Sequence, residues 1–337
     1  MPEFSVGRFL PMKTEILCAS SPAELVRAVE RAAECLHAGE PVALPTETVY
    51  GLAADALRTD AAVKIFEAKE RPFFDPLIVH LPNIDWLGRI AHTDSLLVKR
   101  LIEKFWPGPL TLVLPRSDII PDIVTSGLGT VAVRMSAHPV FQAVANAFGK
   151  PLAAPSANPF GRISPTTARH VRDGLDGRIP LIVDGGPCAV GIESTIVTME
   201  GERLCILRAG PITADDLAPF GEVEFRSAGA APTAPGQMES HYAPRTSLRL
   251  AEHRTSNTKH RTSKVGLLAF TPPGNADEFT AVEILSPTGD LREAAATLFD
   301  KLRRLDAAGL DLIIAETVPE HGLGIAIMDR LRKAAAH

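Results

Sequence analysis

PVALPTETVYGLAADA (residues 41–56) joins a short apolar strand, Val42–Leu44, to a loop rich in threonine and glycine. A helix precedes this strand, because SPAE (21–24) forms a capping box with proline at the first helical position. A second helix begins at Asp60 and must end before Pro72, which cannot continue a helix. A strand set between two helices indicates an α/β fold.

Apolar and amphipathic segments continue to alternate along the chain. We expect strands at 77–81, 110–114, 131–135, 151–156, 181–184, 194–199 and 203–208, and helices at 95–105, 138–148 and 166–175. The last two strands follow one another with no helix between them, so the sheet is predicted to be mixed. The fold expected for this part is a twisted mixed sheet covered by helices.

The composition changes after about residue 222. The segment FRSAGAAPTAPGQMESHYAPRTS (225–247) is rich in Ala, Pro, Gly and Ser and has no periodicity, which is typical of a linker. Beyond it, strands are expected at 265–270, 281–285 and 311–316, and helices at 291–309 and about 325–336. The predicted domains are therefore 1–222 and 248–337, the second a small α/β Rossmann-like domain, with a linker at 223–247.

Composition narrows the functional classes. Of the 337 residues 45% are hydrophobic, as in an ordinary globular protein. The net charge is −5 and only 5% of the residues are aromatic, which argues against a protein whose main function is to bind a nucleic-acid backbone. The four cysteines form no C-x-x-C pair, so neither a disulfide framework nor a zinc site is expected. No apolar run is long enough to span a membrane, and we expect a cytoplasmic protein without a membrane partner.

Polar loops mark the candidate site. They are PTETVYG (45–51), KERPFFDPLIVH (69–80), PSANPFGRISPT (155–166) and GIESTIV (191–197), and most of them adjoin predicted strands. Ligands of α/β proteins collect where such loops meet. Neither a P-loop nor a Rossmann glycine fingerprint is present, so side chains and loop amides would have to hold any nucleotide.

Cations in and near these loops suit phosphate chemistry, which depends on placed positive charge. Lys69 and Arg71 lie two residues apart, and Arg134 and Arg208 each end a predicted strand. The same Lys69 and Arg71 would also stabilise a helix C-terminus, and that alternative stays open. No metal-ligand spacing appears, so magnesium would arrive only with a nucleotide.

The four loops, in this order and followed by LRAG (207–210), resemble the YrdC-like threonylcarbamoyl-AMP synthases over about residues 20–222. HYAP (241–244) and GLGIAIMDRLRKAA (322–335) are similar to the long form of that family, which carries an extra C-terminal domain. The resemblance implies synthesis of L-threonylcarbamoyl-AMP from L-threonine, bicarbonate and ATP, with release of pyrophosphate. A downstream transferase complex would then modify a tRNA adenosine beside the anticodon.

The resemblance also implies roles for particular residues. The threonine-binding set is Thr48, His80, Arg134, the backbone at Ala154, and Ser194. The ATP-binding set is Lys69, Arg71, Asp75, Thr130, Ser156, Asn158, Ser164, Arg208 and Tyr242, with Lys69 and Arg71 as catalytic residues and Tyr242 in a lid. Two positions depart from the family: Asp75 stands where Asn is common, and Ala209 where Pro is common.

Purely structural roles for some of these residues also stay open. Ser156 and Asn158 are typical turn residues, and a histidine such as His80 at the end of an apolar strand is commonly structural. At the level of the whole protein, two other functions stay open. One is an RNA-binding or ribosome-associated factor without turnover, or at least a weak tRNA contact. The other is a carbamoyl-adenylating relative that serves another acceptor.

Overall fold

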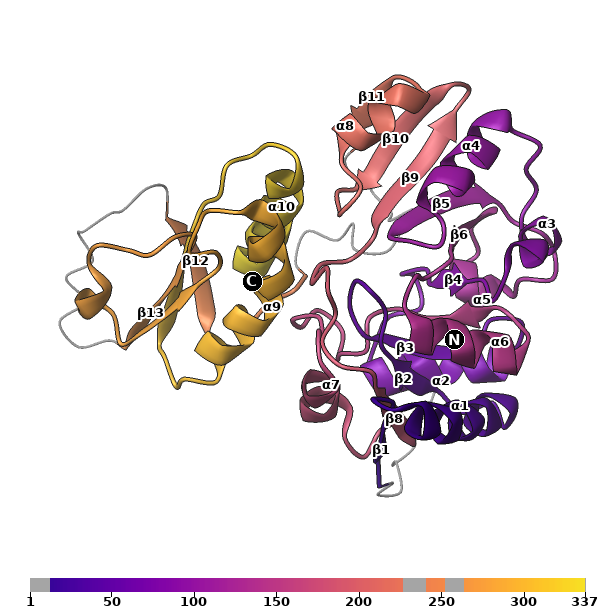
Figure 1. Cartoon of the computed structure of the whole chain (residues 1–337), viewed down its shortest axis with the longest axis horizontal. Coiled ribbons are helices and arrows are strands. Elements are labelled where there is room, and N and C mark those ends of the chain that lie inside the picture. Colours follow the sequence, from indigo (N-terminus) through magenta and orange to yellow (C-terminus); the bar gives the residue numbers. More distant parts are fainter. Residues whose placement is uncertain (1–12, 227–240, 252–263, 337) are drawn as a thin grey trace, which may run out of the picture.

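The computed structural model describes residues 13–226, 241–251 and 264–336. Two sheets organise the chain: an eleven-stranded sheet built by β1 to β11 and a four-stranded sheet built by β12 to β15. They form two adjoining lobes, with the smaller lobe drawn in orange and yellow (Figure 1). Within the described residues, no helix is long and apolar enough to cross a lipid bilayer.

The large sheet has the order β1-β8-β2-β3-β7-β4-β6-β5-β9-β10-β11. Its strands are β1 (Glu15–Cys18), β2 (Val42–Leu44), β3 (Gly51–Asp55), β4 (Ile78–His80), β5 (Leu110–Pro115), β6 (Thr130–Arg134), β7 (Leu152–Ala153), β8 (Leu181–Asp184), β9 (Thr195–Glu200), β10 (Arg203–Arg208) and β11 (Val223–Phe225). The predicted mixed sheet is confirmed, because β4 pairs parallel with β6 whereas β5 pairs antiparallel with it.

Helices cover this sheet: α1 (Pro22–His37), α2 (Thr59–Lys69), α3 (Leu87–Ile90), α4 (Leu96–Phe105), α5 (Asp122–Thr125), α6 (Pro139–Phe148), α7 (Ala168–Leu175) and α8 (Ala214–Leu217). The capping box predicted at the start of α1 is present. The Ser21 hydroxyl accepts from the Glu24 amide at 3.3 Å, and the Glu24 carboxylate accepts from the Ser21 amide at 2.9 Å. These bonds satisfy amides that a helix start leaves free.

Four strands differ from the sequence expectation. β3 lies inside the segment 45–56 expected to be a loop, because its small side chains are all buried and pack in the centre of the sheet. β1 and β11 are edge strands whose partly exposed residues give only a weak apolar pattern. β11 and the start of β12 at Ser247 fall within the expected linker, so the stretch between the two sheets is shorter than 223–247.

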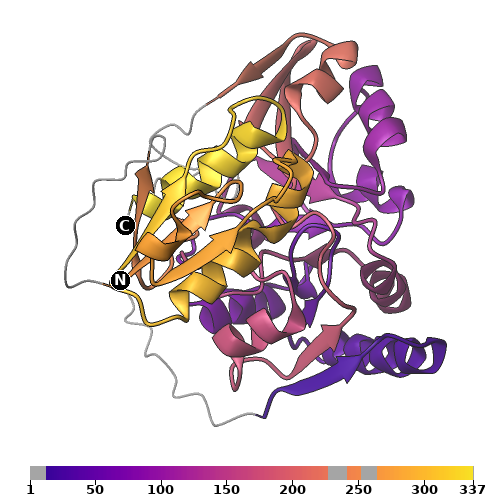
Figure 2. The same cartoon turned by 60° about the vertical axis from the view of Figure 1, so that its left-hand side comes forward.

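The small C-terminal lobe contains β12 (Ser247–Ala251), β13 (Val265–Ala269), β14 (Ala281–Ile284), β15 (Leu312–Glu316), α9 (Leu291–Asp306) and α10 (Leu323–Ala335). All of its strand pairs are parallel, in the order β12-β15-β13-β14. In Figure 1 α9 and α10 lie on the side that faces the larger lobe, and Figure 2 shows both lobes from another side.

The two lobes share one hydrophobic core. Val49, Ile163 and Ile192 of the larger lobe belong to the same buried cluster as Leu298 and Phe299 of α9. Shared apolar burial of this kind favours a fixed arrangement over independently moving domains.

Gly191 allows the lobes to approach closely. Its φ is +79°, which favours glycine, and a Cβ there would lie 2.5 Å from the Ala296 Cα and 2.4 Å from the Ala295 carbonyl oxygen. Both atoms belong to the backbone of α9 and cannot move aside as a side chain would.

We expect Gly191→Ala to lower the thermal unfolding midpoint more than Gly127→Ala. Gly127 has a similar φ of +76° but nothing within 4 Å of its Cβ position, so it carries only the left-handed strain of about 1–2 kcal/mol. Circular dichroism melts of both variants measure the difference. Equal losses would show that the approach of α9 to Gly191 contributes nothing to stability.

Candidate active site

A pocket forms where loops from several strands of the large sheet meet. Its walls come from the 45–51 segment, the ends of β4, β6 and β10, the segment after β7, the residues before β9, and the 241–242 segment. Its empty volume is about 520 Å³ when the open mouth is included. The pocket therefore has the position of a ligand site in an α/β protein.

All five residues of the predicted threonine set line this pocket: Thr48, His80, Arg134, Ala154 and Ser194. The sheet explains part of this grouping, because β4 and β6 run parallel with His80 opposite Arg134. Of the predicted ATP set, Arg71, Ser156, Arg208 and Tyr242 also line the pocket. The structure thus brings the whole threonine set and four of the nine predicted ATP residues to one cavity.

Arg134 is the buried cation at one end of the pocket, with 3% of its surface exposed. Its Nη2 lies 2.6 Å from Glu47 Oε1 as an ion pair, and its Nη1 donates to Thr48 Oγ1 at 3.0 Å. Its Nε is buried without a hydrogen-bond partner among the described residues. A guanidinium held from one side in this way can still present a donor to a carboxylate.

Arg71 and Arg208 place further positive charge in the same cavity. Arg71 Nη2 lies 2.9 Å from Asp75 Oδ2 in a buried ion pair. Arg208 Nη2 donates to the Ser194 hydroxyl at 3.0 Å and to its carbonyl oxygen at 2.9 Å. Burial lowers the pKa of both arginines from the usual value. Buried cations that line a cavity favour an anionic ligand.

Five residues of the predicted ATP set are not among those that line the pocket: Lys69, Asp75, Thr130, Asn158 and Ser164. Lys69 Nζ donates to the carbonyl oxygens of Ser156 and Asn158 at 2.5 and 2.6 Å, so in this conformation it anchors that loop. Burial, and next the neighbouring charge of Arg71, hold the pKa of Lys69 well below its usual value. Thr130 begins β6, the end opposite Arg134.

The helix-capping role considered for Lys69 and Arg71 is not what the side chains do. α2 ends at Lys69, but both side chains bind loop carbonyls that lie outside the helix. Arg71 donates to the carbonyls of Asp75 and Pro76 at 3.2 and 2.9 Å. Asp75 thus holds Arg71 from the protein side, which explains how an acid is tolerated beside a predicted phosphate site.

The segment that begins at His241 contributes to the pocket wall. His241 and Tyr242 line it, and Tyr242 is 1% exposed with a φ of +64°. The Tyr242 ring stacks against Phe299 of α9 at 5.6 Å between centroids. Burial raises the pKa of Tyr242 and lowers that of His241. The remainder of the predicted lid, 227–240, lies outside the described residues.

Buried polar atoms without a hydrogen-bond partner gather around this pocket. Among the described residues they include His80 Nδ1, Arg134 Nε, Asn158 Oδ1, His241 Nδ1, the Tyr242 hydroxyl and Arg330 Nη2. Such atoms are rare in folded proteins because each costs free energy. Four of these atoms belong to residues that line the pocket, His80, Arg134, His241 and Tyr242, so a polar group inside the pocket is in a position to complete their hydrogen bonding.

Several residues at the pocket had no role predicted from the sequence, among them Thr46, Glu47, Glu193 and His241. Glu47 and Glu193 each lie within a quoted loop, next to a predicted threonine contact. Each of these acids lies among mostly small and apolar residues. Because a buried carboxylate needs a cationic partner, this pattern could have indicated a buried ion pair at the site. Arg330 of α10 carried no such signal.

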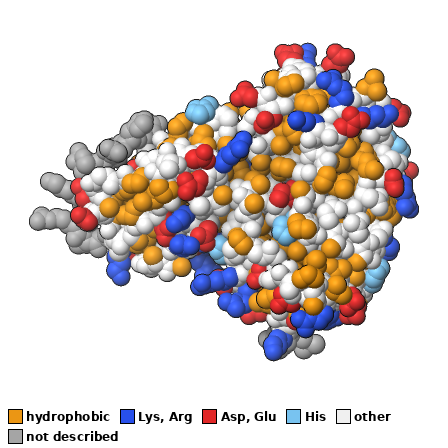
Figure 3. All heavy atoms as spheres, viewed as in Figure 1, with side chains coloured by type: hydrophobic (Ala, Val, Ile, Leu, Met, Phe, Trp, Pro, Cys, Tyr) orange, Lys and Arg blue, Asp and Glu red, His pale blue; other side chains and the backbone are white. Residues whose placement is uncertain are grey.

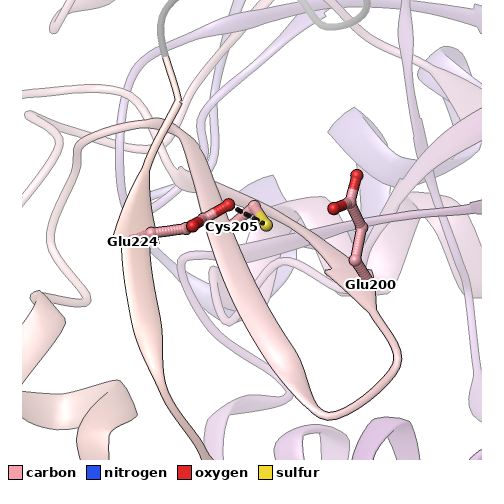
Figure 4. Close-up of side chains that lie close together, drawn as sticks. All are labelled: Glu200, Cys205 and Glu224. Carbon is pink, nitrogen blue, oxygen red and sulfur yellow. Dashed lines mark hydrogen bonds between the residues drawn. The ribbon is translucent and has the colours of Figure 1, made fainter.

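Two other polar clusters were considered. Glu200, Cys205 and Glu224 lie close together on β9 to β11 (Figure 4), but Arg226 pairs with both carboxylates at 2.5 and 2.9 Å. The cluster is therefore already neutralised as a surface ion-pair network, and we propose no metal there.

A wider groove lies between α7 and α9, in a region of the junction where Figure 3 shows several Lys and Arg side chains. Acids are interleaved with its cations: Arg304 pairs with Asp300 at 2.9 Å, and Arg169 lies 3.9 Å from Asp173. The groove is lined by five arginines and three aspartates, so its positive charge is compensated only in part.

A mixed α/β sheet with a pocket of arginines and hydroxyls at its strand ends is suited to binding anionic small molecules. Residues 34–210 match the Sua5/YciO/YrdC family model, described as telomere recombination, and residues 211–336 match the model described as threonylcarbamoyl-AMP synthase, C-terminal domain. The chain belongs to the threonylcarbamoyl-AMP synthase family.

Individual relatives agree with this assignment. A threonylcarbamoyl-AMP synthase of Bacillus subtilis (strain 168) is 41% identical over 91% of this chain and 92% of its own length. The crystal structure of Pyrococcus abyssi Sua5 complexed with L-threonine superposes with a TM-score of 0.89 at 37% identity, covering 96% of this chain and 98% of that one. A synthase of Vibrio campbellii is 34% identical but matches only 46% of this chain, while 85% of its own length is covered.

His80 is buried in the pocket wall with 2% exposure and packs on Phe141 at 4.8 Å between ring centroids. Burial, and next the charge of Arg134, lower the pKa of His80 to about 3, against the opposing effect of Glu47. The ring is therefore neutral at physiological pH.

We expect the free energy of unfolding to fall as the pH drops below about 6.5. In the unfolded chain His80 is protonated below this pH, whereas in the folded protein it stays neutral until the pH nears 3. His80→Gln should make this decline shallower by up to about 1.4 kcal/mol per pH unit. Denaturant unfolding between pH 7 and 4.5 measures it. The exposed His92, changed to Gln, is the control; equal slopes in wild type and His80→Gln would contradict the expectation.

Proposed function

We propose that this protein condenses L-threonine, bicarbonate and ATP into L-threonylcarbamoyl-AMP and pyrophosphate. The observation that carries the proposal is one cavity that holds both the predicted threonine contacts and three of the predicted phosphate contacts, Arg71, Ser156 and Arg208. The names of the relatives, and the L-threonine in the Pyrococcus abyssi structure, support the same chemistry.

The threonine half of the reaction suits the Arg134 end of the pocket. The Nε of Arg134, which has no hydrogen-bond partner within residues 13–226, 241–251 and 264–336, is available to the substrate carboxylate, while Glu47 and Thr48 hold the guanidinium from the other side. The Ser194 hydroxyl, already placed by Thr111 at 2.8 Å and by Arg208, can meet the substrate hydroxyl or amine. These contacts would orient the amine toward bicarbonate.

The nucleotide half suits the Arg71 and Arg208 side, where ATP would enter as its magnesium complex. The threonine amine and bicarbonate give a carbamate and water. A carbamate oxygen then attacks the α-phosphorus in line, and the bond to the pyrophosphate group breaks as pyrophosphate leaves. Arg71 and Arg208 would stabilise the charge on the phosphate oxygens, and Lys69 would join them once the loop it anchors shifts.

The segment containing His241 and Tyr242 would act as a cover over these reactants. Carbamates and mixed anhydrides react with water, so a buried tyrosine and histidine at the mouth have a chemical use. The adenylate is an activated acyl donor. We propose that in the cytoplasm a downstream transferase complex consumes it to modify a tRNA adenosine next to the anticodon.

The direct test is a pyrophosphate-release assay in which threonine and bicarbonate are each omitted in turn. We expect release to require ATP and both other substrates, because the carbamate must form before the phosphorus is attacked. Release that continues without threonine would reject the proposal and favour an adenylating relative with another acceptor. Binding of tRNA without any turnover would favour the RNA-binding alternative.

A second test addresses the carboxylate contact. Arg134→Lys should raise the KM for threonine about tenfold or more, with a smaller effect on the KM for ATP, because a lysine cannot replace the guanidinium fork. Arg203→Lys is the matched control, since Arg203 is also a strand arginine but is exposed and pairs loosely with Glu222 at 3.7 Å. An Arg134→Lys enzyme whose two KM values rise equally would contradict the assignment.

A further inference from the structure

Arg330 brings a charge from the C-terminal lobe to the active site. It lies on α10, and its side chain is 1% exposed. α10 already has Ile327, Met328 and Leu331 for apolar packing. Burying a guanidinium is costly unless it is paired, so its position needs a specific reason.

The guanidinium of Arg330 reaches two segments of the pocket wall. Its Nε lies 3.1 Å from Glu193 Oε2, and its Nη1 donates to the Ala209 carbonyl at 2.6 Å. On its own helix it also pairs with Asp329 at 3.0 Å. It contacts the Tyr242 ring at 5.5 Å from the centroid, within cation–π range. Its Nη2 is buried and has no hydrogen-bond partner among the described residues.

Glu193 is the residue through which Arg330 can act on the reaction. It lines the pocket and immediately precedes Ser194, a predicted threonine contact. Its second carboxylate oxygen, Oε1, accepts from the Ser164 hydroxyl at 2.5 Å. Arg330 and Ser164 therefore hold both oxygens of one carboxylate, which fixes the direction in which the 193–194 segment faces the cavity.

Other contacts show that this part of the C-terminal lobe grips the same loops. Arg303 of α9 donates to the carbonyl oxygens of Ile163 and Ser164. Gly191 touches the backbone of α9 at Ala295 and Ala296. The C-terminal lobe thus contacts both the 160–164 loop and the 191–194 loop. Arg330 in addition contacts the Tyr242 ring.

We propose that Arg330 is a positioning residue of the active site, supplied by the C-terminal lobe, which fixes the Glu193 carboxylate and the Tyr242 ring so that Ser194 and the covering segment face threonine correctly. This inference rests on the proposed function. It gives the C-terminal lobe a part in the reaction that is distinct from folding support.

The test compares Arg330→Met and Arg330→Lys with wild type in the threonine-dependent pyrophosphate assay. Arg332→Met is the matched control, because Arg332 lies on the same helix but is half exposed and pairs with Glu320 at the surface. We expect Arg330→Met to raise the KM for threonine and lower kcat, together at least tenfold in kcat/KM. Arg330→Lys should recover part of this loss, and Arg332→Met should stay within twofold of wild type.

A pH profile separates positioning from a merely structural role. Glu193 faces Arg330 of α10, Arg208 of β10, Tyr242 and the Ser164 hydroxyl, while Asp329 of α10 pairs with Arg330. Burial tends to raise the pKa of Glu193, but Arg330 first, then Arg208 and Ser164, bring it below the usual value. Without Arg330 that pKa should rise, so the acid limb of kcat/KM should move to higher pH in Arg330→Met only.

A double variant guards against simple misfolding. Arg330→Met leaves the Glu193 charge buried without its main partner, whereas Glu193→Gln combined with Arg330→Met removes both charges. The double variant should regain thermal stability but not the threonine KM or turnover. If it regains turnover as well, Arg330 serves only to neutralise Glu193 and the inference is overturned.

The outcomes also separate the two proposals. A wild-type protein that releases no threonine-dependent pyrophosphate overturns the proposed function and the inference together. An active wild type, with Arg330→Met indistinguishable from Arg332→Met in KM, kcat and acid limb, overturns the inference alone.

Discussion

Burial of like charges at one end of the large sheet is the constraint on which the site depends. Lys69, Arg71, Arg134 and Arg208 are all under 8% exposed, and charges this close would repel in a low-dielectric interior. Each is held from the protein side: Lys69 by carbonyl oxygens, Arg71 by Asp75, Arg134 by Glu47, and Arg208 by the carbonyl of Ser194. That support leaves the pocket side of the cluster suited to anions.

Much of the fold and of the pocket could be predicted from the sequence, for a physical reason. Buried strands are recognisable in the sequence as short apolar runs, and the loops at their ends converge. Thr48, His80 and Ser194 could therefore be placed together from spacing and resemblance. The direction in which a side chain points could not be predicted from the sequence. Lys69 turns toward the carbonyls of Ser156 and Asn158, and nothing in the pattern around residue 69 distinguishes that from a phosphate contact.

Ion pairs between residues far apart in the chain could not be predicted from the sequence either. Arg330 and Glu193 are 137 residues apart in the chain, and along α10 the arginine looks like one more charge on the polar face of a terminal helix. Edge strands were missed for a different reason: β1 and β11 have a neighbour on one side only and carry partly exposed residues, so their apolar alternation is weak. Both failures concern tertiary partners, which local periodicity does not encode.

The hydrophobic cluster shared by the two lobes bears on how the family varies in length. Val49, Ile163 and Ile192 are buried, and they share a hydrophobic cluster with residues of α9 and α10. A shorter synthase that consists of the catalytic part alone would present the same three positions to water, where contiguous apolar side chains promote self-association. Gain or loss of the C-terminal lobe in evolution should therefore be accompanied by a change in polarity at those positions, and that change would record which ancestors carried the lobe.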